Sequence, residues 1–218
     1  VEWMNGIQFF LTEDVLREIG HTVYFDSPWA LTTVSQRQYW SDYDLSRFGD
    51  GRVRGILSVD VSDWNTPGML YGKPAKRCTR EEILAEVWAQ LKAHLNESRP
   101  VLRDEMRIDV HLDPGITFPS AGVVENSEPL LIHTVDSWLD RPEAASSIDN
   151  FFLASDYVRT HMDLASMEAA CEAARRGVNA LLARAGSGEA PCLVTPLREP
   201  SLFAPFKEYD RRRFHGGL

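Results

Sequence analysis

The chain has 218 residues, of which 44% are hydrophobic and 25% charged, and its formal net charge is -9. This composition predicts a globular protein with one core or two modest ones. The negative charge argues against a nucleic-acid partner, because surfaces that bind nucleic acids are basic. No apolar run is long enough to span a bilayer, and no signal peptide opens the sequence. The cysteines, Cys78, Cys171 and Cys192, lack metal-ligand spacing, so we expect no metal site and a reducing, cytoplasmic environment.

The first half of the chain predicts short strands between turns. Residues 36–51 are expected to form a short helix or an irregular loop, and residues 65–76 a loop. Apolar or alternating patterns place strands at residues 7–11, 22–25, 31–34, 55–61 and 107–112. Trp3, Trp29 and Trp40 lie near the early turns. Core packing is the favoured role for these indoles, and the lining of an apolar substrate cavity is the alternative.

A helix is expected over residues 79–96. Thr79 and Glu82 have the spacing of a capping box, in which each side chain bonds the other residue's backbone amide. The apolar stripe of this helix is Leu84, Val87, Trp88, Leu91 and Leu95.

The segment 150–183 predicts a strand, a polar turn and a helix. Residues 151–154 have the pattern of a buried strand that stops at Ser155 and Asp156. A helix follows, with Asp163 as its expected N-cap and Gly186 just past its end. Its apolar positions share one face, which we expect to be buried, with Cys171 as a core filler: Leu164, Met167, Cys171, Ala174, Val178, Leu181 and Leu182.

The start of that helix suits an anionic or carbonyl-bearing ligand, because its first amides are unpaired and carry partial positive charge. The small residues Ala165 and Ser166 would let a ligand approach the backbone, and Asp156 could accept hydrogen bonds from ligand hydroxyls. Pattern alone favours the alternative, a core helix behind a core strand. Residues 130–134 predict one more strand, after which His133 and Trp138 have no role that the pattern reveals.

The run Asn150-Phe-Phe-Leu-Ala-Ser-Asp156, followed by Asp163-Leu-Ala-Ser-Met-Glu168 and Ala174-Arg-Arg, resembles the C-terminal flavin-binding motif of the flavin amine oxidase superfamily. The resemblance is greatest to the branch with phytoene desaturases and hydroxysqualene dehydroxylases, and segments 3–10 and 26–32 are similar to that branch too.

This resemblance implies an α+β fold that corresponds to the C-terminal half of the superfamily's FAD-binding proteins. Residues 1–125 would form part of a substrate domain with a mixed or antiparallel sheet. Residues 126–188 would form the final strand–helix unit of the Rossmann-like FAD-binding domain, and residues 189–218 an extended tail. Arg211-Arg212-Arg213 in that tail is a basic patch, with a solvated tail as the favoured role and membrane or partner contact as the alternative.

The resemblance also implies a site. Asp156 would bind the ribityl or pyrophosphate part of FAD, and the backbone at 165–167 would face the N1/O2 edge of the flavin. Trp138 would lie beside the cofactor or its substrate. The implied cofactor-binding set is Ser155, Asp156, Asp163, Ala165, Ser166 and Met167.

Two departures from the family pattern bear on the activity. Ser155 stands where the family usually has glycine, and Ser166 stands where monoamine oxidases have the tyrosine of an amine-binding cage. No cysteine is placed for covalent flavin attachment, so we expect noncovalent FAD.

The sequence contains no Gly-x-Gly-x-x-Gly, the dinucleotide fingerprint of the family's first βαβ unit. We therefore expect the fingerprint to come from an N-terminal half or a separate subunit, this chain being a fragment, a processed chain or a small subunit. The leading hypothesis is an FAD-dependent oxidoreductase that takes hydride from an apolar, isoprenoid-like substrate. The alternatives are a flavin amine oxidase and a non-catalytic subunit or scaffold.

Overall fold

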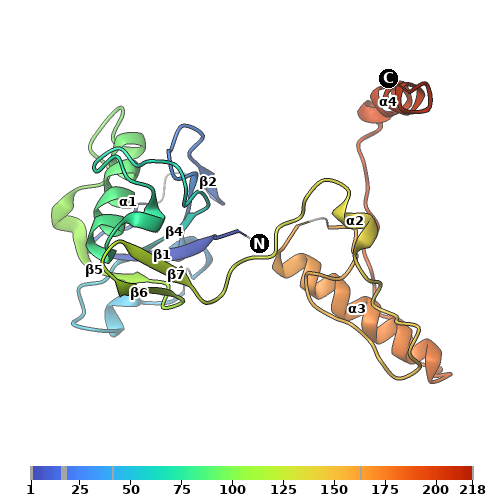
Figure 1. The fold of residues 1–218 in the computed structure, drawn as a ribbon. Helices are drawn as coiled ribbons and strands as arrows, with labels where there is room; N and C mark the ends of the chain where they lie inside the picture. The colour runs from blue at the N-terminus through green and yellow to red at the C-terminus, as the bar shows by residue number, and fades with distance from the viewer. Residues whose placement is uncertain (1, 16–18, 41, 163, 218) are drawn as a thin grey trace. The chain divides into compact units, whose positions relative to one another are not determined.

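The computed structural model describes residues 2–15, 19–40, 42–162 and 164–217. The chain divides into two units, the sheet unit Val1–Leu130 and the C-terminal unit Leu131–Leu218 (Figure 1). The division falls after Leu130, whereas the sequence placed it after residue 125. The architecture is α+β, as expected, and every strand pair described is antiparallel.

The sheet unit contains a five-stranded sheet in the order β2-β3-β4-β1-β5. Its strands are β1 (Asn5–Leu11), β2 (Thr22–Val23), β3 (Leu31–Ser35), β4 (Gly55–Val61) and β5 (Arg107–Leu112). All five lie where the sequence predicts strands. A separate hairpin of β6 (Ile116–Ser120) and β7 (Val123–Asn126) was not predicted.

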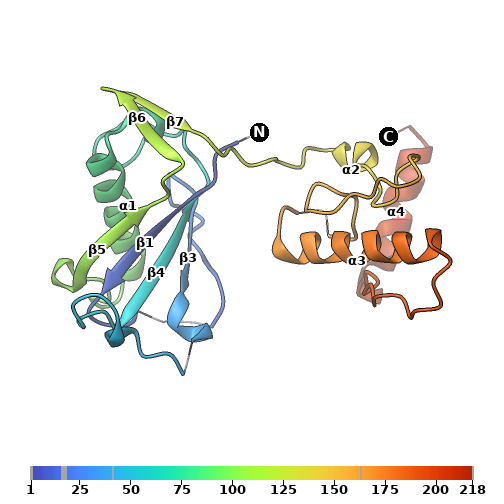
Figure 2. The same cartoon turned by 90° about the horizontal axis from the view of Figure 1, so that it is seen from below.

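Helix α1 (Arg80–Leu95) covers one face of this sheet (Figure 2). The predicted capping box at its start is confirmed, since Thr79 Oγ1 accepts from Glu82 N and Glu82 Oε2 accepts from Thr79 N. Every residue of its predicted stripe is buried against alternate residues of β1 and β4. The alternation leaves the second face of the sheet uncovered by α1.

A chain of buried polar groups ties α1 to the loops around the core. The Ser27 hydroxyl donates to Gln90 Oε1 at 2.7 Å, and Gln90 Nε2 donates to Glu86 Oε1 at 2.9 Å. The Glu86 carboxylate also accepts from the backbone amides of Met69 and Leu70. Charge-assisted bonds of this kind offset the cost of burying the carboxylate, and they fix the loop on the helix.

The C-terminal unit contains α2 (Ser137–Asp140), α3 (Met167–Arg184), the 3-10 turn Ser201–Phe203 and α4 (Ala204–His215). Its buried hydrophobic cluster consists of Ala144, Val158 and Ala173, with Leu153 packed against them. No helix in the described part of the chain has both the length and the apolar character of a membrane span.

Two strands predicted in the second half do not form. Residues 151–154 make only a bridge between Phe152 and Ala145, and Phe151 is half exposed. The segment 130–134 is reduced to a bridge between Leu130 and Glu2. An apolar run becomes a strand only where a neighbour satisfies its backbone groups, and neither run has more than one paired residue.

The second predicted helix exists, but its start and its buried face differ from expectation. Helix α3 is capped by Ser166, not by Asp163, which lies outside the described residues. The buried positions are the small residues Ala169, Ala173 and Gly177. The expected apolar face is largely exposed, with Cys171 on the surface and Met167 85% exposed. Small residues spaced by four let α3 approach the backbone beside it, and large side chains at those positions would prevent that contact.

The tail was expected to be extended, and the part after residue 203 is instead the helix α4. Pro205 lies in its first turn, where the missing N–H costs nothing because these amides have no helical acceptor.

The buried carboxylate of Glu86 predicts a strong effect at Gly68. A Cβ at Gly68 would lie 2.5 Å from Glu86 Cδ, and Glu86 cannot move without breaking three hydrogen bonds. We expect Gly68→Ala to lower the free energy of unfolding by about 2 kcal/mol, measured by urea unfolding with tryptophan fluorescence. Gly6→Ala is the matched control, because its Cβ would meet Asp60 Oδ1 at an ordinary 3.8 Å. Equal stability of the two variants would contradict this account.

Candidate functional site

The predicted flavin turn begins at Ser155, whose backbone has φ 116°. The turn is closed by a hydrogen bond from Val158 N to Ser155 O at 3.2 Å. Residues with a Cβ rarely adopt positive φ, whereas glycine does so without steric cost. The position where the family usually has glycine is therefore one at which this backbone favours glycine.

The guanidinium of Arg141 holds this turn by its carbonyl groups. Arg141 is 7% exposed, and it donates from Nε to Tyr157 O at 3.1 Å and from Nη2 to Val158 O at 3.0 Å. Nη2 also donates to Asp156 O. One planar cation thus binds three consecutive carbonyls and fixes the path of the chain through the turn.

Asp156, in this turn, is half-buried. Its Oδ1 accepts from Ser155 Oγ at 3.1 Å, and within the described residues Oδ2 has no hydrogen-bond partner. Because Arg141 bonds the backbone of Asp156 and not its side chain, the carboxylate is positioned yet available to a ligand hydroxyl.

The turn packs on the middle of α3. Val158 is fully buried in a cluster with Ala173, and a Cβ on Gly177 would lie 3.3 Å from Leu153 O. The absence of a side chain at Gly177 therefore permits this close approach between the 153–158 segment and the helix.

The first turn of α3 offers amide groups to a ligand. Ser166 Oγ accepts from Ala169 N at 3.2 Å, and Ser166 O accepts from Ala170 N. Within the described residues, no acceptor is assigned to the amides of Met167 and Glu168. Ala165 and Ser166, which the sequence predicts to face a ligand, are half-buried. Asp163 belongs to the same predicted set but is outside the described residues.

Trp138, the predicted substrate residue, is fixed from two sides. Its indole Nε1 donates to Thr160 O at 3.0 Å, and the guanidinium carbon of Arg159 lies 5.2 Å from the ring centroid. The side chain is 37% exposed, and a ligand could contact that exposed part.

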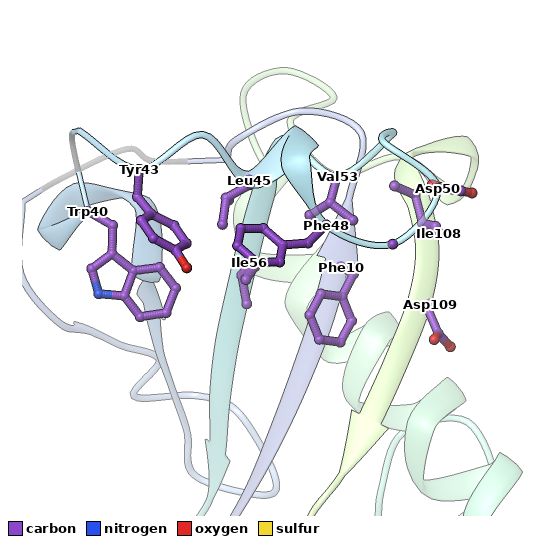
Figure 3. Close-up of a pocket in the computed structure, with 11 residues that line it drawn as sticks. Phe10, Trp40, Tyr43, Leu45, Phe48, Asp50, Val53, Ile56, Ile108 and Asp109 are labelled. Carbon is purple, nitrogen blue, oxygen red and sulfur yellow. The ribbon is translucent and has the colours of Figure 1, made fainter.

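A second candidate site is an apolar pocket of about 520 Å³ on the face of the sheet opposite α1 (Figure 3). Its floor is formed by residues of β1, β4 and β5, and Trp40 with residues of the loop 42–53 forms its wall. The lining residues are Phe10, Trp40, Tyr43, Leu45, Phe48, Gly49, Asp50, Val53, Ile56, Ile108 and Asp109.

The wall of the pocket is an aromatic loop shaped by two aspartates. The rings of Tyr43 and Phe48 stack at 5.3 Å between centroids, and Trp40 meets Tyr43 edge-on at 6.2 Å. Asp44 accepts from the amide and hydroxyl of Ser46, which lowers the pKa of the Asp44 carboxyl. Asp50 accepts from the amide and the side chain of Arg52, which lowers the pKa of the Asp50 carboxyl. These local bonds set the path of the loop over the sheet.

A register shift in β5 adds one apolar side chain to the floor. Phe10 pairs with Asp109 and Leu11 with Arg107, so Ile108 is the extra residue of a bulge. The bulge lets the consecutive residues Ile108 and Asp109 both reach the pocket.

Sequence reasoning identified Trp40 as a possible cavity residue but missed the rest of this pocket. Trp29 is fully buried and Trp3 packs against the core, so these two have the favoured core role. The available signal was the presence of Phe10 and Ile56 at outward positions of two otherwise alternating strands. Such outward apolar residues need a cover or a ligand.

The chain was compared with protein-family models, with curated proteins and with solved structures, and no match was found in any of the three.

The positive φ of Ser155 predicts a gain from glycine. We expect Ser155→Gly to stabilise the turn by about 0.5–1 kcal/mol, which corresponds to roughly two- to fivefold slower local opening. The measurement is hydrogen–deuterium exchange of the Val158 amide, which donates across the turn. Ser147→Gly, at an exposed residue without positive φ, is the control and should not slow this exchange. Faster exchange in Ser155→Gly would show that the hydroxymethyl group supports the turn.

Proposed function

We propose that this chain is the C-terminal part or subunit of a cytoplasmic FAD-dependent oxidoreductase that takes hydride from an apolar, isoprenoid-like substrate. The observation that carries the proposal is the positive φ of Ser155, immediately before Asp156. Resemblance to the family predicts glycine at this residue, and the backbone has the conformation that glycine favours. The backbone geometry supports the turn that the sequence motif predicts.

The residues of the C-terminal unit fit noncovalent FAD. Asp156 would accept hydrogen bonds from the ribityl or pyrophosphate part, since its Oδ2 is unoccupied by the described residues. The amides that open α3 would stabilise negative charge on the flavin ring, because a helix start carries partial positive charge. The bound flavin would supply the hydride acceptor, and the protein would supply orientation and a dry surface.

The apolar pocket of the sheet unit supports the class of substrate. Eight of its lining residues are apolar or aromatic, and two carboxylates are at the rim. A pocket of this kind favours hydrocarbon over strongly polar ligands, because apolar contact replaces water at the aromatic wall.

The structure also supports the proposed partner that carries the dinucleotide fingerprint. The buried hydrophobic cluster of the C-terminal unit contains only small or medium side chains. Meanwhile α3 exposes Met167, Val178 and Leu181. So small a core is a weak basis for independent stability, and a partner surface on α3 would bury the missing apolar area.

The alternatives receive less support. Ser166 uses its hydroxyl to cap α3, so this residue supplies neither an aromatic cage nor a free polar group for an amine. A non-catalytic scaffold is compatible with the fold but gives no reason for a carboxylate at Asp156 whose Oδ2 is unoccupied by the described residues. Loss of flavin on mutation of Asp156 separates a scaffold from an enzyme.

FAD binding is the first test of this proposal. Coexpressed with the polypeptide that supplies the dinucleotide fingerprint, the chain should yield a complex with flavin absorbance. Asp156→Ala should weaken FAD binding by roughly tenfold or more, because a hydrogen bond to a charged group is lost.

The matched control is Asp140→Ala, which removes an exposed carboxylate of α2. It should leave the flavin content unchanged. Complex formation should also protect the exposed Cys171 thiol from a maleimide reagent. A folded complex without flavin would refute the proposal, and equal flavin content in both variants would refute the role of Asp156.

Substrate class is the second test. Ile56→Asp places a charge in the pocket floor and should weaken binding of a long-chain isoprenoid hydrocarbon by about tenfold or more. The titration can be followed by tryptophan fluorescence, since Trp40 lines the wall. Val123→Asp puts the same charge on an exposed strand residue that does not line the pocket, and it should not change the affinity. Equal affinity of both variants would place the hydrocarbon elsewhere.

A further inference from the structure

We propose that helix α4 docks on the surface of an anionic lipid bilayer. The helix follows the segment 188–200, which has no regular secondary structure, and continues directly from the 3-10 turn Ser201–Phe203. Five large apolar or aromatic side chains of this turn and helix are between 51% and 79% exposed: Leu202, Phe203, Phe206, Tyr209 and Phe214.

The aromatic side chains of this region share one side. At about 100° per residue, Phe203, Phe206, Tyr209 and Phe214 fall within an arc of roughly 140°. Exposed aromatic side chains on one side of a helix that also carries cations suit the bilayer interface.

Helix α4 as a whole is basic, although the chain as a whole is acidic. Residues 204–215 contain four lysines and arginines and two acidic residues, a net charge of +2, whereas the whole chain has -9 and the remainder therefore -11. Glu208 is shared by Arg211 and Arg212, at 2.8 Å and 2.9 Å. The net positive charge of α4 suits an anionic lipid surface, whereas the rest of the chain is acidic on balance.

Two residues within the apolar arc set the depth of docking. Arg213 lies against Tyr209, with 5.9 Å from its guanidinium carbon to the ring centroid, and its long side chain can reach lipid phosphates from within the arc. Asp210 lies between the aromatic residues in the projection and opposes deep insertion. The helix is therefore suited to the headgroup level, where phenylalanine and tyrosine rings are favoured.

This proposal does not require FAD, although a bilayer contact would suit an enzyme with an apolar substrate. The test uses the full chain with vesicles of phosphatidylcholine, either alone or mixed with phosphatidylglycerol, and measures cosedimentation. We expect binding to the anionic vesicles that weakens with added salt, and little binding to phosphatidylcholine alone. Exchange of the α4 amides should slow when anionic vesicles are added to the wild-type chain.

Two variants of α4, each with a matched control, separate the contribution of the arginines to lipid binding from that of the phenylalanines. Replacing Arg211, Arg212 and Arg213 by Gln should weaken binding roughly fivefold for each arginine removed. The same change at Arg77, Arg80 and Arg99, which are exposed in the sheet unit, alters the net charge equally and should leave binding unchanged. Phe206→Ser with Phe214→Ser should abolish binding, whereas Ile19→Ser with Phe25→Ser, at equally exposed residues, should not.

Three results would overturn the proposal. They are absence of binding to anionic vesicles, equal loss in the control variants, and protection of the α4 amides by a coexpressed polypeptide without lipid, which would assign the helix to a protein partner. Flavin absorbance is recorded on the same coexpressed complex. A complex that has flavin absorbance but does not bind lipid refutes membrane docking and leaves the flavoprotein proposal standing. A complex without flavin that binds lipid refutes the flavoprotein proposal and leaves membrane docking standing.

Discussion

The candidate cofactor site depends on one interaction, the contact between the Arg141 guanidinium and three consecutive carbonyls of the 156–158 backbone. A turn that contains a positive φ at Ser155 is strained, and it persists only where its surroundings impose it. Arg141 supplies that constraint from outside the turn. The Asp156 side chain is therefore not needed to hold the turn, and its one hydrogen bond is with Ser155 Oγ among the described residues. Arg141 thereby positions the Asp156 carboxylate through the backbone, without bonding to the carboxylate itself.

The two faces of the sheet are covered in different ways. On one face, buried Glu86 and Gln90 hold the loops by charge-assisted hydrogen bonds and leave no space beside Gly68. On the other face, apolar residues of three strands lie beneath a loop whose shape comes from local bonds of Asp44 and Asp50. The first face is specified by contacts distant in sequence, whereas the loop bonds of Asp44 and Asp50 over the second face join residues two apart.

Local signals in the sequence predicted the sheet unit well. The alternation in 55–61 and the Thr79–Glu82 capping box depend on neighbouring residues, and both are confirmed. The strand expected at 151–154 depended on pairing partners that a local pattern cannot supply, and it does not form. The pocket was missed for a similar reason, because a bulge at Ile108 and a loop from elsewhere in the chain build it.

Helix α3 shows where periodicity alone misleads. Its large apolar residues follow a helical repeat, yet the chain buries the small ones, Ala169, Ala173 and Gly177, and Gly177 admits the backbone at Leu153. A sequence with two apolar faces on one helix needs two surfaces to cover them. The C-terminal unit supplies one of them, the segment that carries Ser155 and Asp156. The large residues of α3 remain exposed, and they form the face that the proposed partner would cover.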